Sequence, residues 1–366
     1  MSDAPNNSGR PPCEALDLYE RVRYLASTMG LSDPIVVTGA AGFIGFHLSE
    51  RLLLQGRRVV GHDNLNAYYD PSLKRARLQA LSRHPLWQFH EGDLTNAEGV
   101  SQLVGMSGGT VVHLGAQAGV RWSIENPTAY VSSNLVGFAN VLEACRAAGT
   151  RHLVYASSSS VYGANGKVPF DARDNVDHPV SLYAATKKSN ELMAHVYAHL
   201  FGIPCTGLRF FTVYGPWGRP DMAYWKFTEA ILRGRPIEVY GSGVLERDFT
   251  YVDDVVEAIT RLLDSPPMPS TEWSGEHPDP SSSASPYRIY NIGNHTPVTV
   301  NEMVGILERL CDRKAIRVFR PKPPGDVDRT FADVGPLMRD FGFSPSTRLE
   351  DGLARFVDWF RSWSAR

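Results

Sequence analysis

Short apolar runs rich in β-branched residues alternate with segments of helical periodicity through the first part of this chain. Such runs are typical of strands covered on both faces, and their alternation with helices predicts a parallel sheet. Strands are expected at 34–38, 58–62, 87–90, 110–114, 151–156, 205–211 and, after a long interval, 287–292. We therefore expect an α/β fold with a Rossmann-type, doubly wound parallel sheet.

Helical periodicity and changes in composition predict how the chain is divided. Helices are expected at 46–55, within 64–81, at 127–148, around 183–193, and at 222–234, 299–311 and 348–363. After about residue 210 the chain becomes loop-like and aromatic, and 266–287 is rich in Pro and Ser, as a surface excursion would be. Three parts are predicted: a partly disordered extension over 1–30, a nucleotide-binding Rossmann domain over 31–210, and a smaller second domain over 211–366 that is interleaved with the first.

The composition is ordinary for a globular protein. Hydrophobic residues make up 43% of the 366 positions, charged residues 21%, and the formal net charge is −2. This balance gives no reason to expect nucleic acid or a membrane as a partner, and no apolar run approaches the roughly 20 residues of a membrane span. Residues 1–30 lack an apolar core and contain acidic residues, which argues against a targeting peptide. The cysteines, at 13, 145, 205 and 311, show no metal-site spacing, so we expect a cytoplasmic protein with reduced thiols and no metal.

A glycine-rich turn follows the first predicted strand. Gly39, Gly42 and Gly45 form the pattern Gly-x-x-Gly-x-x-Gly between that strand and the first helix. Glycine permits a tight turn and close approach of a pyrophosphate to the backbone, and the helix N-terminus offers N–H groups to the anion. The turn predicts a dinucleotide site, although the spacing differs from Gly-x-Gly-x-x-Gly.

Polar residues after the second and third strands extend this predicted site. Asp63 ends the second strand, where a carboxylate accepts both adenosine-ribose hydroxyls and repels a 2′-phosphate, so it favours NAD over NADP. Asp93 follows the third strand and is a candidate partner for the adenine amino group. The basic helix after Asp63 carries Lys74, Arg75 and Arg77, and we expect most of these on a solvated face rather than at cofactor phosphates.

The fourth strand and the helix after it suggest a cofactor surface and a buried network. Small residues over 115–121 would let a cofactor lie against the backbone. Asn134 stands on an otherwise apolar stretch of the helix 127–148. Because buried polar side chains need partners, we expect Asn134 to order a local network, whether structural or catalytic.

Two features predict acid–base chemistry. Tyr183 and Lys187 are four residues apart, so they share one face of a helix. A free phenol has a pKa of about 10 and is a poor base, but a nearby cation lowers that pKa, so the pair is a candidate proton shuttle. The serine run 157–160 ends the fifth strand, where open α/β sheets bind ligands.

Together these motifs resemble the extended short-chain dehydrogenase/reductase family over about residues 34–360. Within that family the chain is similar to the UDP-glucuronate 4-epimerases, on the segments 63–75, 116–121, 215–223 and 277–280. One departure is Gly115, where relatives usually carry alanine, and residues 1–30 are not part of the family pattern. The resemblance implies an isomerase with NAD as cofactor, a UDP-sugar as substrate and a homodimeric assembly.

The resemblance also implies the site residues. The catalytic residues are Ser158, Tyr183 and Lys187. NAD is bound by Gly39, Gly42, Phe43, Ile44, Asp63, Asn64, Asp93, Leu94, Leu114, Ala116, Gln117, Asn134, Tyr183, Lys187 and Val213. The UDP-sugar is bound by Ser158, Ser159, Ser160, Tyr183, Thr212, Arg219, Arg247 and Asp326.

The implied reaction converts UDP-glucuronate into UDP-galacturonate through a transient 4-keto sugar. Tyr183 takes the proton from O4 while NAD takes the C4 hydride, and the keto sugar then turns before the hydride returns. Three alternatives remain: an epimerase of a neutral UDP-sugar, a UDP-glucuronate decarboxylase, and an NAD-binding protein without turnover. Related dehydratases and decarboxylases carry an acidic residue beside the active-site hydroxyl, whereas this chain has only hydroxyls over 158–160.

Overall fold

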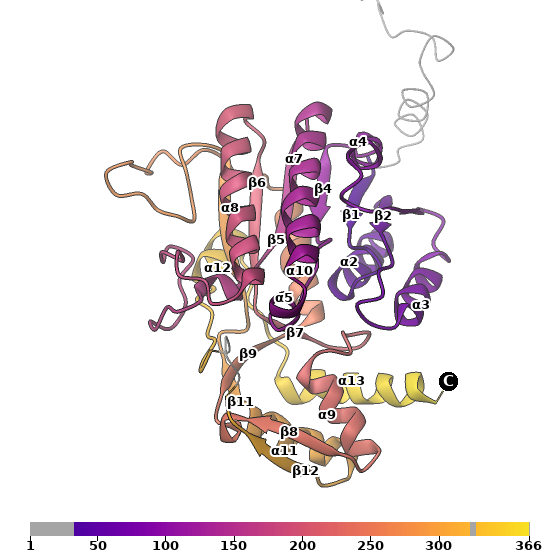
Figure 1. Cartoon of the computed structure of the whole chain (residues 1–366). Coiled ribbons are helices and arrows are strands. Elements are labelled where there is room, and N and C mark those ends of the chain that lie inside the picture. Colours follow the sequence, from indigo (N-terminus) through magenta and orange to yellow (C-terminus); the bar gives the residue numbers. More distant parts are fainter. Residues whose placement is uncertain (1–32, 323–326, 366) are drawn as a thin grey trace, which may run out of the picture.

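The computed structural model describes residues 33–322 and 327–365. The predictions for the extension 1–30 and for Asp326 lie outside the described residues. Figure 1 shows a large sheet covered by helices in the upper part of the molecule, and a smaller group of strands and helices below it.

The large sheet has seven parallel strands in the order β10-β6-β5-β4-β1-β2-β3. Its strands are β1 (Ile35–Thr38), β2 (Val59–Asp63), β3 (Trp87–Glu91), β4 (Thr110–His113), β5 (His152–Ser158), β6 (Cys205–Phe210) and β10 (Tyr287–Ile292). The predicted Rossmann-type fold is confirmed. The chain reverses direction across the sheet between β1 and β4, and open sheets of this kind bind ligands at the carboxyl ends beside such a reversal.

Helices cover both faces of this sheet. They are α2 (Phe43–Leu54), α3 (Pro71–Leu81), α4 (Ala97–Gly105), α7 (Gly137–Ala148), α8 (Leu182–Phe201) and α10 (Val252–Leu263). On β1, Ile35 and Val37 belong to one core cluster with Phe46 of α2, whereas Val36 belongs to another with Phe138 of α7. Burial on both faces explains why the strands are continuous apolar runs. Figure 1 shows α7 and α8 side by side across one face.

The lower part contains two small sheets and further helices. One sheet joins β7 (Thr212–Tyr214), β9 (Glu246–Tyr251) and β11 (Pro297–Thr299), and the other pairs β8 (Pro236–Tyr240) with β12 (Ile316–Arg320). The helices of this lower part are α9 (Ala223–Leu232), α11 (Val300–Cys311) and α13 (Leu349–Ser364), whereas α12 (Gly335–Phe341) lies beside β10 of the large sheet. The strands of the two small sheets and α4, α10 and α12 were not predicted. These strands pair with segments distant in the sequence, as when Thr212 pairs with Phe249.

Two predicted helices have different bounds. The helix predicted at 46–55 begins at Phe43, because the extended backbone of Gly42 ends the turn and caps the helix. The helix predicted at 127–148 consists of α6 (Pro127–Tyr130), a π-helical segment over Val131–Val136, and α7. A π-helical turn re-aims side chains and often occurs at functional sites.

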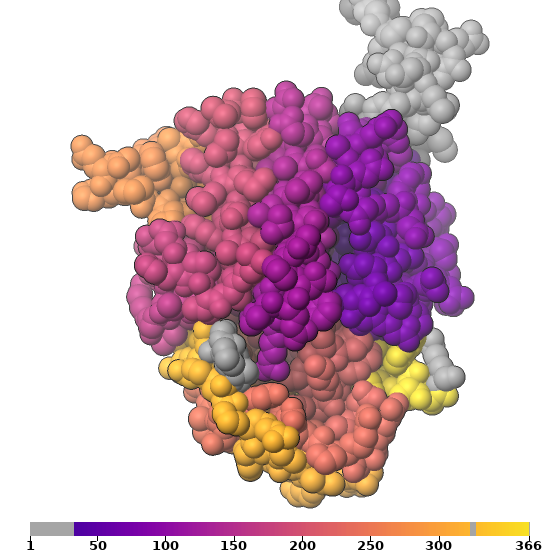
Figure 2. Space-filling view, in the orientation of Figure 1, coloured from indigo at the N-terminus to yellow at the C-terminus, as the bar shows by residue number. Residues whose placement is uncertain are grey.

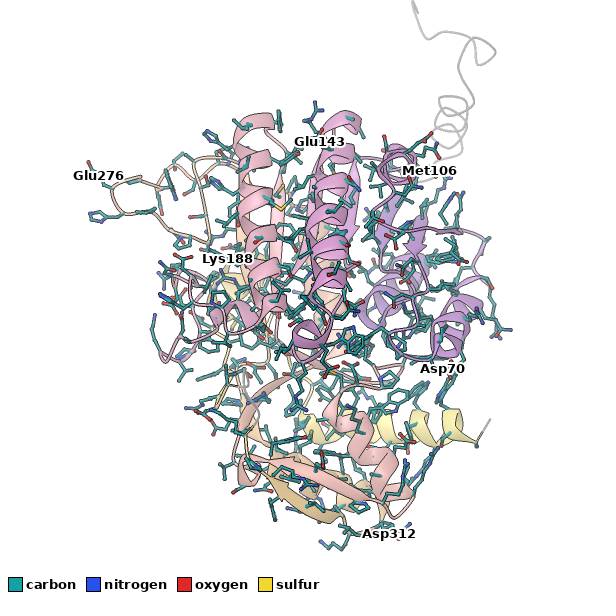
Figure 3. The ribbon with its side chains drawn as sticks, in the orientation of Figure 1. Asp70, Met106, Glu143, Lys188, Glu276 and Asp312 are labelled. Atoms are coloured by element: carbon teal, nitrogen blue, oxygen red, sulfur yellow. The ribbon has the colours of Figure 1, made fainter. Side chains whose placement is uncertain are left out.

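The Pro- and Ser-rich segment between α10 and β10 projects from the body of the molecule. Glu276 lies at its tip, well away from the sheet (Figure 3). Its return limb is attached to α8, where Nε2 of His195 lies 2.9 Å from Oγ of Ser283. This segment therefore takes no part in the cavity described next.

Candidate active site

A cavity of about 840 Å³ lies between the carboxyl ends of the large sheet and the lower part of the molecule. Figure 2 shows how these two parts, indigo to pink above and orange to yellow below, meet along one boundary. The predicted site residues that line the cavity are Gly39, Gly42, Phe43, Ile44, Asp63, Asn64, Asp93, Leu94, Leu114, Ala116, Gln117, Ser158, Ser159, Ser160, Tyr183, Lys187, Thr212, Val213, Arg219 and Arg247. Segments far apart in the sequence thus converge on one space.

The glycine turn forms one end of the cavity from main-chain atoms. Gly39 has φ +70°, and a Cβ there would lie 2.7 Å from the backbone nitrogen of Gly115. A Cβ at Gly45 would lie 2.2 Å from the carbonyl oxygen of Gly39. The N-terminus of α2 has no side-chain cap and no acidic residue in its first turn. This cradle of free N–H groups fits a pyrophosphate, as NAD would require.

Carboxylates at the strand ends flank this turn. Oδ1 of Asp63 accepts hydrogen bonds from Leu65 N (2.9 Å) and Lys74 Nζ (3.3 Å). Asn64 Nδ2 donates to Asp93 Oδ2 over 2.7 Å. Although partial burial opposes it, hydrogen bonds from neighbouring groups lower the pKa of Asp93. Both acids are therefore fixed acceptors at the edge where an adenosine ribose and adenine would lie.

Asn134 lies behind the cavity wall rather than in it. Its Oδ1 accepts from Gln117 N (2.8 Å), and its Nδ2 donates to Gln117 O (3.0 Å) and Thr186 Oγ1 (3.1 Å). Its own carbonyl, in the π-helical segment, accepts from Asn190 Nδ2 over 2.7 Å. Asn134 therefore ties the loop after β4 to α8, which is the network expected of it, and it does not line the cavity.

The proposed acid–base residues lie together at the centre of the cavity. Ser181 caps α8 by accepting from Ala184 N over 3.1 Å, and this places Tyr183 in the first turn of the helix. Burial raises the pKa of Tyr183, while a hydrogen bond with Ser158 and the charge of Arg219 lower it. Oγ of Ser158 also accepts from Ser160 N over 3.2 Å, which fixes the serine turn.

Lys187 does not act on Tyr183 as expected. Its Nζ donates to the carbonyl oxygen of Ala156 over 2.9 Å, and burial lowers its pKa to about 8. The charge that lowers the pKa of Tyr183 comes instead from Arg219, in a loop 36 positions further along. The expected lowering of the Tyr183 pKa by Lys187 is therefore wrong, since burial raises that pKa on balance.

An ion pair that was not predicted lines the cavity. Nε and Nη2 of Arg219 donate to the two carboxylate oxygens of Asp221 over 3.0 and 2.6 Å. The hydroxyl of Tyr68 donates to the same carboxylate over 3.3 Å. Burial, followed by the charge of Asp221, raises the pKa of Tyr68 to about 12. The residues lie in segments that the family resemblance had marked, but neither Asp221 nor Tyr68 was singled out.

The basic helix α3 is not the solvated face that was expected. Arg75 is exposed, but Lys74 and Arg77 are buried. Lys74 is paired with Asp63, while Arg77 reaches into the loop that carries Arg219. A count of charges along the helix could not show this, because the partners lie outside it.

The remaining predictions concern Arg247, metal binding, membrane spans and the cysteines. Arg247 lines the cavity, and its Nη1 donates to the carbonyl oxygen of Glu246 over 2.8 Å. Within 33–322 and 327–365 no group of acidic, His and Cys side chains could hold a metal ion. Over the same ranges, no helix combines the length and apolar character needed to cross a bilayer. The described cysteines, 145, 205 and 311, are buried thiols.

Comparisons with known proteins agree with this geometry. The model of the NAD dependent epimerase/dehydratase family matches residues 35–293. Protein CapI of Staphylococcus aureus is 54% identical over 327 residues, which are 89% of this chain and 98% of that protein. A probable UDP-glucuronate 4-epimerase of Rhizobium meliloti is 48% identical over 327 residues, 89% of this chain and 96% of that protein.

A solved structure is similar as well. The UDP-glucuronic acid 4-epimerase of Bacillus cereus, in complex with UDP-glucuronic acid and NAD, superposes with a TM-score of 0.81 at 32% identity, covering 90% of this chain and 99% of that one. The family predicted from the motifs is confirmed. This chain belongs to the NAD dependent epimerase/dehydratase family.

Proposed function

We propose that this protein is an NAD-dependent UDP-glucuronate 4-epimerase, which forms UDP-galacturonate through a transient 4-keto sugar. The observation that carries the proposal is one cavity lined by Tyr183 and Ser158 together with the glycine turn and Arg219. The proteins similar to this chain include a probable UDP-glucuronate 4-epimerase and a UDP-glucuronic acid 4-epimerase in complex with UDP-glucuronic acid and NAD.

The residues at the centre manage the proton of the sugar O4. Because burial favours the neutral phenol, the proton-accepting form of Tyr183 depends on Ser158 and on the charge of Arg219. Tyr183 takes the proton from O4 in one half-reaction and returns it in the other, with Ser158 holding O4 by a hydrogen bond. Lys187, anchored at Ala156, would hold the nicotinamide ribose. Bound NAD supplies the acceptor and the donor for the hydrogen at C4.

The glycine turn, Asp63 and Asp93 would hold this cofactor. The turn and the first N–H groups of α2 would bind its pyrophosphate, since glycine at 39 and 45 allows a tight turn where a Cβ would collide with neighbouring backbone. Asp63 would accept hydrogen bonds from the ribose hydroxyls, and Asp93 would accept one from the adenine amino group. Gln117 and its neighbours, fixed by Asn134, would form the surface beneath the nicotinamide end.

The part of the cavity lined by Ser159, Ser160, Thr212 and Arg219, called the sugar end below, must keep the substrate from losing CO2. A β-keto acid loses CO2 readily when its carboxylate is poorly hydrogen-bonded and its C–C bond lines up with the carbonyl π system. Ser159, Ser160 and Thr212 offer hydroxyls, and Arg219 a guanidinium, to hold the carboxylate out of that alignment. Arg247 would bind the diphosphate. Asp326, which the family resemblance placed at the uridine ribose, stays a prediction.

The assembly and the division of the chain are part of the proposal. Leu192, Val196 and Leu200 are 57%, 47% and 63% exposed along one face of α8, a pattern that suits a homodimer built through this helix. Sedimentation of the wild type at dimer mass, and of Val196→Glu at monomer mass, would support it. The division near residue 210 and the cytoplasmic location stay predictions.

The function is tested by the products formed from UDP-glucuronate. Purified protein is incubated with the sugar nucleotide and NAD, and the products are separated by chromatography. UDP-galacturonate without released CO2 is expected. A UDP-pentose with CO2 would indicate a decarboxylase, and no product at all would indicate a binding protein. Parallel incubation with UDP-glucose tests whether a neutral sugar is preferred.

A further inference from the structure

Arg77 connects the glycine turn with the loop that carries Arg219, although Arg77 itself does not line the cavity. The residue is fully buried on α3. Its Nη1 donates to the carbonyl oxygen of Ala41, within the glycine turn, over 2.8 Å, and to the hydroxyl of Tyr69 over 2.8 Å. Its Nη2 donates to the carbonyl oxygen of Gly218 over 2.9 Å and to that of Trp217. One guanidinium therefore contacts both the cofactor turn and the loop 215–222 that carries Arg219.

The charge of Arg77 is not neutralised by an ion pair with any described carboxylate, and its Nε is buried without a partner. A buried cation is costly unless an anion compensates it, and carbonyl dipoles do so only in part. The nearest structure suited to an anion is the turn to which Arg77 is bonded, where the pyrophosphate would lie.

The loop on the other side of Arg77 is held in one conformation from several directions. Trp217 has φ +58°. The centroid of its ring lies 5.2 Å from the ring centroid of Trp359 and 5.4 Å from that of Phe46. Nε2 of His47 lies 2.9 Å from the carbonyl oxygen of Pro216. A non-glycine residue with positive φ persists only where its surroundings fix it. The position of Arg219 therefore depends on these contacts, two of which come from α2, directly after the turn.

We propose that Arg77 is a positioning residue that couples the two ends: cofactor bound at the turn stabilises the loop that presents Arg219 to the uronate. This inference rests on the proposed function. The coupling is reciprocal, because two ligands that favour the same conformation raise each other's affinity by the same factor. The affinity for uridine diphosphate, which lacks the uronate, should change much less when NAD binds.

The coupling is measured as the factor by which NAD tightens UDP-glucuronate binding to the full chain. Titrations with and without saturating NAD are made in a Tyr183→Phe background, which prevents turnover. With Arg77 present, NAD should tighten UDP-glucuronate about tenfold and uridine diphosphate less than about threefold. Arg77→Met and Arg77→Lys should both reduce the factor for UDP-glucuronate below about threefold, since lysine keeps the charge but has no fork to span both sides.

A matched control stands two positions away on the same helix. Arg75 is exposed, so Arg75→Met should leave the factor unchanged. If Arg77→Lys keeps the full factor, or if Arg75→Met loses it equally, the bridging role is wrong. In steady-state assays of the otherwise wild-type enzyme, Arg77→Lys should raise KM for UDP-glucuronate more than it lowers kcat.

A measurement on the wild type guards against variants that do not fold. Hydrogen exchange of the amides over 216–222 should slow when NAD is added, and unchanged exchange there would overturn the proposal. This readout is independent of turnover. If the wild type converts no UDP-glucuronate the proposed function fails, whereas normal turnover without coupling contradicts only the role of Arg77.

Discussion

The two ends of the cavity are built in different ways. The cofactor end is built around main-chain groups at the ends of β1, β2 and β4, with glycines where a Cβ would collide with neighbouring backbone and the carboxylates of Asp63 and Asp93 beside them. The sugar end consists of polar and charged side chains, above all Arg219 with Asp221 and Tyr68. The first is rigid by covalent geometry, and the second by hydrogen bonds between segments far apart in the sequence.

This difference has a consequence for function. A backbone cradle recognises a pyrophosphate whatever sugar is processed, so it suits a cofactor that is common to a family. Side chains in a loop can change without disturbing the sheet, so under the proposed function the sugar end would set the preference for an acidic sugar. Substitutions at the two ends should therefore separate cofactor binding from substrate selection.

The largest effect is expected at the centre, where the two ends meet. Tyr183→Phe removes the hydroxyl that transfers the proton of O4, and kcat should fall by about 10³-fold or more. NAD binding should change little, because the cradle and Asp63 are untouched; fluorescence titration of NAD checks this. Turnover at the wild-type rate would rule out Tyr183 as the base.

A substitution at the cofactor end should weaken NAD binding for every sugar alike. Gly39→Ala puts a Cβ 2.7 Å from the nitrogen of Gly115 at a φ of +70°, and NAD affinity should fall by about 10- to 100-fold. Gly56→Ala is the control: its φ is +75°, but nothing lies within 4 Å of the added Cβ. If both variants bind NAD equally well, the cradle is not the cofactor site.

At the sugar end the effect should depend on the substrate. Thr212→Val keeps the shape of the side chain and removes the hydroxyl offered to the uronate carboxylate. The kcat/KM for UDP-glucuronate should fall by about tenfold, while that for UDP-glucose should change by less than about twofold. Competition assays with both sugars in one mixture give the ratio directly. Equal losses for the two sugars would contradict a carboxylate contact.

The smallest effect concerns the pH dependence of turnover. The charge of Asp221 raises the pKa of Tyr183, whereas Arg219 lowers it. Asp221→Asn removes the negative charge, so the pKa of Tyr183 should fall and its proton-accepting form should be present at lower pH. The rising limb of kcat against pH should move to lower pH by on the order of half a unit. A shift toward higher pH would contradict this electrostatic assignment.

The same contrast explains what the sequence could predict. The strands around Val36 and Val60, the glycine turn and the helix of Tyr183 carry local patterns, and the structure has each of them at the predicted place, although the helix continues to Phe201, well beyond the predicted end at 193. The burial of Arg77 and the pairing of Asp221 with Arg219 carry no such pattern, because each depends on contacts between distant segments. Asp221 lies within the family-like segment 215–223, so the resemblance marked the region but not the residue.

The expected acidity of Tyr183 failed for a related reason. A spacing of four residues places Lys187 on the same helix face, but it says nothing about what each side chain bonds to. Lys187 turns to the carbonyl oxygen of Ala156, and the effective cation, Arg219, comes from the loop after β7. Side-chain orientation and burial decide a pKa, and neither can be read from spacing alone.

The central claim is that C4 of the sugar is oxidised and then reduced from the opposite face while the sugar stays in one cavity. It is tested most directly with UDP-glucuronate that carries deuterium at C4, incubated with the enzyme in ordinary water and followed by NMR and mass spectrometry. The account predicts UDP-galacturonate that keeps all its carbon and keeps the deuterium at C4, because the hydrogen leaves and returns within one closed site. Product with solvent hydrogen at C4, or a pentose formed with loss of CO2, would contradict it.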